Sequence, residues 1–450
     1  MNPSNPRNPE PALSLSKGSG AWIEFDEQFV WHPYTQMQLV PRAIGVERGE
    51  GAYLYLTDGH RIFDSISSWW VTLHGHAHPK IARAIAEQAA KLEQVIFAGF
   101  THEPAARLAK KLVEITPEAL DKVFFSDDGS TAVEAAIKMC LQYWKHVGED
   151  RKEIIAMEHA YHGDTFGAMS VSARGPFTAP FNEFLFEVRR MPFPTPPLDA
   201  EDTAFSSEEM KFLDALRSAA RTDRAAAFIY EPLLLGSGGM LTWRASVLEA
   251  ALKIAKEFGI LTIADEVLTG FGRTGTMFAS DHVSHKPDLM TLSKGITGGF
   301  LPMGVTMASS KIFEAFLSTD RARTFFHGHS YTGNPISTAA ALASLDIFET
   351  EPVKERIAAI ASTHAALAPN LAAKHHLRLR QIGTIVAFEP MESAGYLSRK
   401  SLEWGSRALE MGLLLRPLGD TIYFLPPYSA TRDDLEFAYD TVDRILSEAH

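Results

Sequence analysis

The chain has 450 residues, of which 46% are hydrophobic and 22% charged, and its formal net charge at pH 7 is −12. This balance is typical of a globular protein long enough for two domains, and it excludes disorder over most of the chain. The acidic charge disfavours nucleic acid or an anionic membrane as the main partner, because both favour clustered Lys and Arg. Cys140 is the only cysteine, so no internal disulfide can form.

The N-terminal residues 1–21 are rich in Pro, Asn and Ser, which predicts a disordered tail. They lack the apolar centre of a signal peptide, and no apolar run in the chain has transmembrane length. We therefore expect a cytoplasmic protein. From residue 22 to 75 short alternating runs such as 52–56 predict strands, which we assign to the first part of a small domain.

The central segment, residues 76–345, alternates short β-branched runs with helical patterns, which predicts βα units around a mostly parallel sheet with helices on both faces. We assign it to one large α/β domain. The strands expected from the pattern are 123–125, 154–157, 226–230 and 260–264, and the helices expected between them include one that begins near residue 129 and one over 246–258.

The C-terminal residues 346–450 again resemble a smaller unit. The pattern predicts a strand over 382–388 and amphipathic helices over 399–411 and 432–448. We infer that residues 22–75 and 346–450 together form a smaller α+β domain beside the large one.

Lys294 and Asp265 are the most informative residues. Lys294 ends the apolar run 288–293 and is followed by glycines, and Asp265 ends the strand expected over 260–264. A lysine at a strand end can be held desolvated and partly neutral, as a Schiff-base amine must be. A buried carboxylate one βα unit earlier suits the ring nitrogen of pyridoxal phosphate. The alternative for Lys294 by itself is an ordinary surface charge.

Two further segments fit the same sheet edge. Gly129 and Ser130 begin a helix, where backbone N–H groups and the helix dipole favour a phosphate, although an ordinary helix cap explains them equally. Tyr161 follows a strand and offers a flat ring to stack on a pyridine, with a core aromatic as the alternative. His162 beside it has the alternative of a loop histidine bonded to backbone.

The polar loop 326–335 ends in an Asn cap and Pro335 at a first helical position. Its two histidines raise the question of a metal, but no paired-ligand spacing or cysteine set accompanies them, so we predict no metal site. Residues 270–275 contain glycines after Asp265 but do not form the G-x-G-x-x-G pattern, which disfavours a dinucleotide fold.

The assembled motifs resemble the class III aminotransferases of the fold type I pyridoxal-phosphate enzymes. They are Gly129-Ser130, Tyr161 to Asp164, Glu231-Pro232, Asp265 to Gly275, Ser293 to Gly295 and Gly333 to Pro335, in family order over about residues 22 to 445. The resemblance implies pyridoxal 5'-phosphate as cofactor, with Lys294 bound to its aldehyde, Asp265 on its ring nitrogen, Gly129 and Ser130 around its phosphate, and Tyr161 and Val267 on its two faces. It also implies a homodimer with active sites at the subunit interface, because Ser330 by analogy reaches the neighbouring subunit's phosphate.

Three motifs on the substrate side resemble the biotin-pathway branch of this family: residues 31–35, 67–70 and 415–428. That branch converts 8-amino-7-oxononanoate to 7,8-diaminononanoate, usually with S-adenosylmethionine as amino donor, and a lysine-using variant exists. The resemblance implies a substrate site in which Arg416 binds a carboxylate. Its residues are Tyr34, Trp69, Trp70, Gly328, Arg416 and Tyr423.

Other functions remain open from the sequence. A different class III aminotransferase acting on a diamine, an ω-amino acid or another primary amine would use the same core motifs. An aminomutase on the same scaffold would need no second substrate. Core packing explains Trp69 and Trp70 taken singly, and a structural ion pair explains Arg416.

Overall fold

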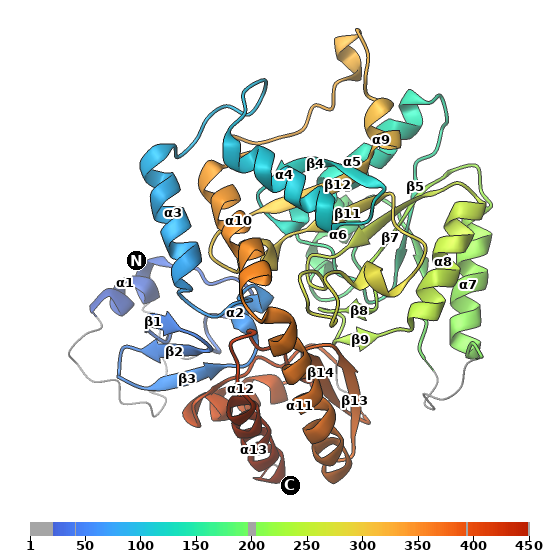
Figure 1. The fold of residues 1–450 in the computed structure, drawn as a ribbon. Helices are drawn as coiled ribbons and strands as arrows, with labels where there is room; N and C mark the ends of the chain where they lie inside the picture. Colours follow the sequence, from blue (N-terminus) through green and yellow to red (C-terminus); the bar gives the residue numbers. More distant parts are fainter. Residues whose placement is uncertain (1–20, 41, 197–203, 393–394, 449–450) are drawn as a thin grey trace, which may run out of the picture.

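The computed structural model describes residues 21–40, 42–196, 204–392 and 395–448 (Figure 1). The tail predicted to be disordered lies outside the described residues except for its last residue. Ala21 begins helix α1 (Ala21–Phe29), which the sequence pattern did not predict.

A seven-stranded sheet forms the centre of the molecule. Its spatial order is β4 (Leu120–Ser126), β12 (Gly304–Ser309), β11 (Leu289–Leu292), β10 (Leu261–Asp265), β7 (Ala225–Tyr230), β5 (Glu153–Met157) and β6 (Arg189–Met191). Strand β12 pairs antiparallel with both of its neighbours, and the other pairs are parallel. The predicted mostly parallel α/β sheet is therefore confirmed.

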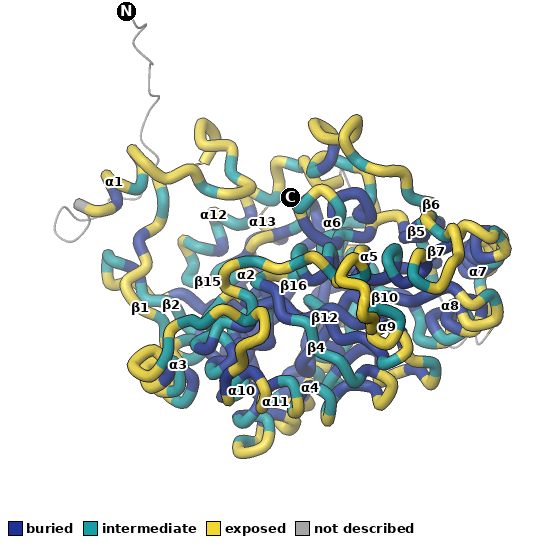
Figure 2. Tube along the Cα trace, turned by 90° about the horizontal axis from the view of Figure 1, so that it is seen from above, coloured by how far each residue is buried: buried dark blue, intermediate teal, exposed yellow. Residues whose placement is uncertain are grey.

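Helices cover both faces of this sheet because its strands are apolar on both sides. In β5, Ile154 and Ala156 pack with helix α5 (Gly129–His146). Ile155 and Met157 point to the other face, where α7 (Ser207–Ala220) and α8 (Ala245–Glu257) pack. Figure 2 shows the result as buried strands enclosed by helices whose outer sides are exposed.

The remaining elements of this region complete the two helical layers. Helices α4 (Glu103–Ile115) and α10 (Pro335–Thr350) share a buried core with β4, β11 and β12. The others are α3 (Pro79–Lys91), α6 (Phe166–Val171), α9 (Ser310–Glu314), the short pair β8 (Leu234–Leu235) and β9 (Leu241–Thr242), and the 3₁₀ turns η1 (Ala179–Phe184), η2 (Ala279–His282), η3 (Lys294–Thr297) and η4 (Arg321–Arg323).

Both ends of the chain meet in a second, smaller region. Strand β15 (Leu413–Leu414) pairs with β3 (Arg61–Asp64), so the C-terminal part extends the N-terminal sheet. The other elements here are β1 (Val46–Glu50), β2 (Tyr53–Leu56), α2 (Ser67–Trp70), α11 (Val353–Lys374), β13 (Leu377–Ile382), β14 (Ile385–Pro390), α12 (Lys400–Glu410), β16 (Ile422–Phe424) and α13 (Arg432–Glu448).

The strand predicted over 382–388 is confirmed only for residues 385–388, which belong to β14. Strand β13 ends at Ile382 and β14 starts at Ile385, and these two residues face each other across a two-residue turn. Gly383 has φ +53°, a left-handed conformation that its missing Cβ permits, and the chain reverses there. Ile382 before the turn and the apolar residues of β14 after it look like one strand when only periodicity is considered.

The predicted division at residues 345 and 346 falls inside the continuous helix α10, and the division into domains stays a prediction. In the part of the chain that the structure describes, no helix is both long and apolar enough to cross a membrane.

Candidate active site

Lys294 stands at the carboxyl end of β11, at the start of η3. Its backbone has φ +44°, an uncommon conformation for a residue with a side chain. Such strained conformations persist where the surrounding structure holds them, often at functional sites. The side chain lines a cavity of about 680 Å³, and its Nζ lies 5.1 Å from the centre of the Trp70 ring. Burial lowers the pKa of Lys294, and the charges of Asp265 and Glu231 oppose that shift only in part. The amine is therefore available in its neutral form closer to neutral pH than an ordinary lysine.

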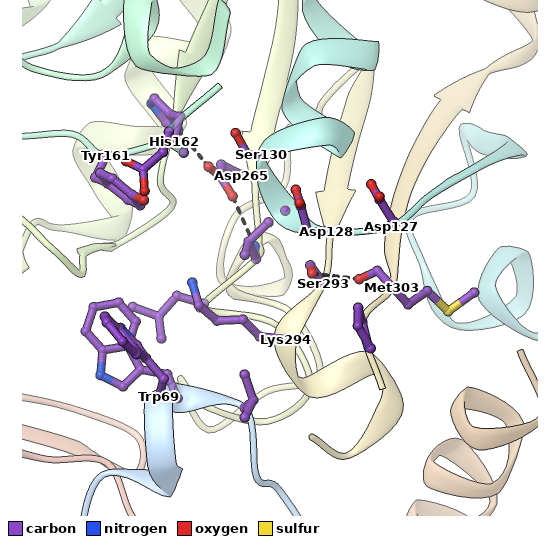
Figure 3. A pocket seen from close by; sticks show the side chains of 18 of the residues that line it. Trp69, Asp127, Asp128, Ser130, Tyr161, His162, Asp265, Ser293, Lys294 and Met303 are labelled. Carbon is purple, nitrogen blue, oxygen red and sulfur yellow. Dashed lines mark hydrogen bonds and ion pairs between the residues drawn. The ribbon is translucent and has the colours of Figure 1, made fainter. Parts of the chain in front are cut away.

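Asp265 ends β10 and lines the same cavity (Figure 3). Its Oδ2 lies 2.7 Å from Nδ1 of His162, and its Oδ1 accepts a 3.1 Å hydrogen bond from the backbone N–H of Val267. The carboxylate and the imidazole are both buried. His162 thus orients Asp265 through its ring nitrogen, in place of the backbone bond expected for a loop histidine.

The N-terminus of α5 forms a tight cradle on the cavity wall. Asp128 caps the helix by accepting from the backbone N–H of Thr131, which leaves the N–H groups of Gly129 and Ser130 at the free end. A Cβ on Gly129 would lie 2.8 Å from Cγ1 of Val267, and one on Gly163 would lie 2.2 Å from Oγ of Ser130. These glycines are therefore required by close packing, and the helix end suits a phosphate.

Tyr161 and Tyr34 form a hydrogen-bonded cluster beside this cradle. Their hydroxyl oxygens lie 3.2 Å apart, and the Tyr34 hydroxyl donates to Asp164. Burial and the bond to Asp164 raise the pKa of Tyr34 to about 12, and burial raises the pKa of Tyr161 as well. Both phenols are therefore neutral near pH 7 and act as hydrogen-bonding groups.

Trp70 and Trp69 occupy different depths. Trp70 is buried, lines the cavity, and donates from Nε1 to the Tyr423 hydroxyl at 2.9 Å. Tyr423 therefore supports Trp70 from behind and does not itself line the cavity. Trp69 is 40% exposed, with its ring 5.4 Å from that of Tyr34 and 4.4 Å from the guanidinium carbon of Arg416.

Arg416 is exposed at the mouth of this region. Among the described residues no carboxylate pairs with it, so a structural ion pair is not what holds it there. An unpaired guanidinium above an indole face is well placed to bind a carboxylate from outside the chain.

The segment that carries the two tryptophans is strained. Ser67, Ser68 and Trp70 have φ of +53°, +59° and +67°. Buried Asp64 holds them, since it accepts from the backbone N–H and the hydroxyl of Ser68, and His76 bonds to the same carboxylate at 2.8 Å. Strain of this kind persists only where neighbours over-determine it, which fits a site that must present Trp69 and Trp70 in fixed positions.

Gly328 and Ser330 lie on the loop after η4 and do not line the cavity of their own chain. Ser330 is exposed, and its carbonyl accepts from Nε2 of Gln94 at 2.6 Å. A single chain therefore brings together Lys294, Asp265, Tyr161, Gly129, Ser130 and Val267 and leaves this loop outside.

Glu231 also lines the cavity, and the sequence analysis gave it no role beyond its family motif. It follows the fully buried strand β7, and its carboxylate accepts from the backbone N–H groups of Tyr161 at 2.9 Å and Gly236 at 3.0 Å. Burial raises the pKa of Glu231 to about 7, and the charge of Asp265 adds to the shift. A carboxylate after six apolar residues was the signal that could have marked it.

We expect Glu231→Gln to change how stability depends on pH. The pKa of Glu231 is about 7 in the folded chain and about 4.3 in an unfolded one, so the folded state binds more protons between these values. The protonated carboxyl's contribution to stability is fully present below about pH 4 and is lost as the pH rises through 7. Across that window the free energy of unfolding of the variant, relative to that of wild type, should rise by on the order of 3 kcal/mol.

Urea unfolding at pH 5, 6, 7 and 8 without added cofactor measures this difference. Glu231→Gln also loses a hydrogen-bond acceptor, which changes the free energy of unfolding by the same amount at every pH. Only the pH dependence of the difference between variant and wild type therefore reports on titration of the carboxyl. The exposed Glu410→Gln is the matched control. Parallel profiles for Glu231→Gln and wild type would contradict the prediction.

The model of the aminotransferase class-III family matches residues 34–446, nearly the whole described chain. The chain belongs to the class III aminotransferases. Enzymes of this class depend on pyridoxal phosphate in general, and the aminotransferase has their α/β fold, fold type I.

Individual relatives of the aminotransferase are similar over almost their full length. The adenosylmethionine-8-amino-7-oxononanoate aminotransferase of Synechococcus elongatus is 46% identical, over 93% of this chain and 98% of that protein. The protein of the same name from Aquifex aeolicus is 38% identical, over 94% and 97%.

Solved structures show the same similarity. The adenosylmethionine-8-amino-7-oxononanoate aminotransferase of Methanocaldococcus jannaschii superposes with a TM-score of 0.88 at 34% identity, over 95% of this chain and 98% of that one. An omega transaminase from Pseudomonas jessenii in complex with PMP superposes with a TM-score of 0.86 at 28% identity, over 95% and 97%.

Proposed function

We propose that this aminotransferase converts 8-amino-7-oxononanoate to 7,8-diaminononanoate in biotin synthesis, with S-adenosylmethionine as amino donor. The observation that carries the proposal is Arg416, a guanidinium without a carboxylate partner that lies against Trp69, a residue lining the cavity that contains Lys294. The relatives named above support the choice of substrates.

Pyridoxal 5'-phosphate fits the residues around the cavity. Gly129 and Ser130 would bind its phosphate, Asp265 its ring nitrogen and Lys294 its aldehyde carbon, with Tyr161 and Val267 on the two faces of the ring. The cradle that a Cβ would fill and the partly unused acceptor capacity of the Asp265 carboxylate favour this fit. Bound pyridoxal phosphate supplies an aldehyde that carries the amino group and a ring that accepts the electron pair of a broken C–H bond.

Lys294 moves the protons. Its lowered pKa lets Nζ take a proton from the reacting carbon as a neutral amine and return it as an ammonium group to the neighbouring atom. Asp265 carries a fixed negative charge in a buried place, which keeps a proton on a ring nitrogen without reorganisation during the reaction. His162 holds that carboxylate in position.

The two substrates meet the same amine in turn. For the oxononanoate, Trp69, Trp70 and Tyr34 form an apolar slot for the aliphatic chain, and Arg416 binds the carboxylate at its far end. Burial of Trp70 against Tyr423 keeps one wall of the slot rigid.

We expect Arg416→Ala to weaken the oxononanoate half-reaction by about 10- to 150-fold, because a hydrogen bond to a charged group contributes about 1.5–3 kcal/mol. The loss should appear in KM more than in kcat, since the clamp acts equally before and during the reaction. Arg416→Lys should recover part of it. The exposed Arg399→Ala is the matched control. A loss of equal size with the amino donor alone would count against a clamp for this acceptor.

We also propose a homodimer with active sites at the interface, in which the exposed loop with Gly328 and Ser330 completes the neighbouring subunit's phosphate and substrate site. The loop's place outside its own cavity supports this proposal. Light scattering of the purified protein checks it, and a monomer at micromolar concentration would refute it.

The decisive experiment mixes purified enzyme and pyridoxal phosphate with 8-amino-7-oxononanoate and either S-adenosylmethionine or lysine. Diamine formation with S-adenosylmethionine is the expected result. Turnover of an ω-amino acid or a simple amine without any diamine would instead support the wider group to which the Pseudomonas jessenii enzyme belongs. Amino transfer within a single substrate would indicate an aminomutase.

A further inference from the structure

A second cavity of about 250 Å³ opens beside the first. The two share part of one wall, formed by Tyr161, Gly163, Asp164 and Ser237. The remaining walls come from the segment after α6, the turn between β8 and β9, and residues of the C-terminal part that include Tyr396. A space this small fits one part of a ligand whose other part lies in the main cavity.

Phe177 stands where the two cavities meet. Its ring centre lies 4.5 Å from that of Tyr396, 5.9 Å from that of Tyr34 and 6.2 Å from that of Tyr161. Tyr161 lines both cavities, Tyr34 is bonded to Tyr161 without lining either cavity, and Tyr396 lines the second cavity only. Phe177 and Tyr396 therefore form an aromatic wall that leads out of the catalytic centre.

The charged side chains Arg174, Glu389 and Asp164 in the wall of this second cavity have partners within the protein. Arg174 donates to the backbone carbonyls of Met169 and Ser170, Glu389 forms a 2.7 Å ion pair with Arg380, and Asp164 accepts from the Tyr34 hydroxyl. The rest of the lining is mainly aromatic rings, hydroxyl side chains and backbone groups. Such a lining suits a flat, neutral ring and suits a small anion or an aliphatic ammonium group poorly.

We propose that the second cavity holds the nucleoside end of the amino donor, and that Phe177 and Tyr396 set the preference for such a donor over an aliphatic one. The inference rests on the proposed function. Both substrates must reach Lys294 in turn, and the acceptor is a thin aliphatic acid whose far end is bound at Arg416. A donor that carries an adenosyl group needs room that the acceptor does not, and this cavity lies beside the same centre.

Phe177→Ala and Tyr396→Ala test the proposal in separate half-reactions of the cofactor-loaded enzyme. Base stacking on one aromatic side chain corresponds to roughly 5- to 150-fold in binding. We expect the efficiency of the S-adenosylmethionine half-reaction to fall by a factor in this range in each variant, and the oxononanoate half-reaction to fall much less. Preference should shift toward lysine. Tyr396→Phe, which keeps the ring, should recover most of the S-adenosylmethionine efficiency that Tyr396→Ala loses.

The control is Phe181→Ala. Phe181 is 40% exposed, packs edge-on against Phe166 and lines neither cavity, so the same truncation there should leave both half-reactions unchanged. Thermal melting shows whether each variant is folded. If Phe177→Ala does not fold, Tyr396, which is 36% exposed, still gives the test.

The outcomes separate this inference from the proposed function. Wild-type enzyme that forms no diamine with any donor contradicts the proposed function. Wild-type enzyme that forms diamine with S-adenosylmethionine, while both alanine variants lose the two half-reactions equally or lose neither, overturns only the second cavity's role. Diamine formation with lysine and none with S-adenosylmethionine overturns both the second cavity's role and the proposed amino donor, and leaves the proposed acceptor and product standing.

Discussion

Lys294→Ala should lower turnover by about 10⁴-fold or more, because general acid–base catalysis alone contributes about 10²–10⁴-fold and the covalent link to the cofactor is lost as well. The structure explains the size of the effect. Nζ of Lys294 projects into the cavity with a lowered pKa, and the buried carboxylates that share this space cannot replace it as a neutral base. The visible absorption of the covalently bound cofactor should disappear in the same variant.

Stopped-flow and steady-state assays of Lys294→Ala measure the loss. A small primary amine added to the solution should restore part of the rate, since the truncation leaves space beside the reacting carbon. Lys256→Ala, which removes an exposed lysine on α8, is the matched control and should change nothing. Turnover near the wild-type rate in Lys294→Ala would remove the central assignment of this site.

Asp265→Asn should lower the rate of amino transfer by about 10²–10³-fold, the cost of removing one fixed electrostatic partner from a buried catalytic site. Asparagine has the same shape, and its single Oδ1 can still accept from the Val267 N–H, while its NH2 group faces Nδ1 of His162, which can accept as a neutral imidazole. It lacks the negative charge, so a proton on the ring nitrogen is no longer favoured. The defect should therefore appear in kcat with little change in protein stability or substrate KM.

A cofactor analogue sharpens this test. With a pyridoxal phosphate analogue whose ring nitrogen is replaced by carbon, wild type should be slow and Asp265→Asn should cost little more, because the two changes remove the same interaction. Asp214→Asn, at an exposed position of α7, serves as control. If the rate losses caused by the analogue and by Asp265→Asn multiply, Asp265 acts on something other than the ring nitrogen.

The local sequence pattern was sufficient to predict most strands of the central sheet. The strands expected over 123–125, 154–157, 226–230 and 260–264 all exist, with ends that differ by at most three residues. Buried parallel strands are apolar on both faces and end at glycines or polar residues, so their signal lies within a few adjacent residues. The error at Gly383 arose because Ile382, on the other side of the two-residue turn, continues the apolar pattern of β14.

What the sequence alone determined is the chemistry: a lysine and an aspartate, each at the end of an apolar strand, and a glycine-serine helix start. Parallel strands place their carboxyl ends on one edge, so these groups had to meet. The tertiary structure alone decided how they are held and what surrounds them. Four contacts show this: Glu231 with Tyr161, Asp64 with the strained Ser68, Tyr423 with Trp70, and Phe177 with Tyr396. The two residues of each contact lie between 4 and 353 positions apart in the sequence. Most of these contacts depend on packing between distant segments, which no local period in the chain encodes.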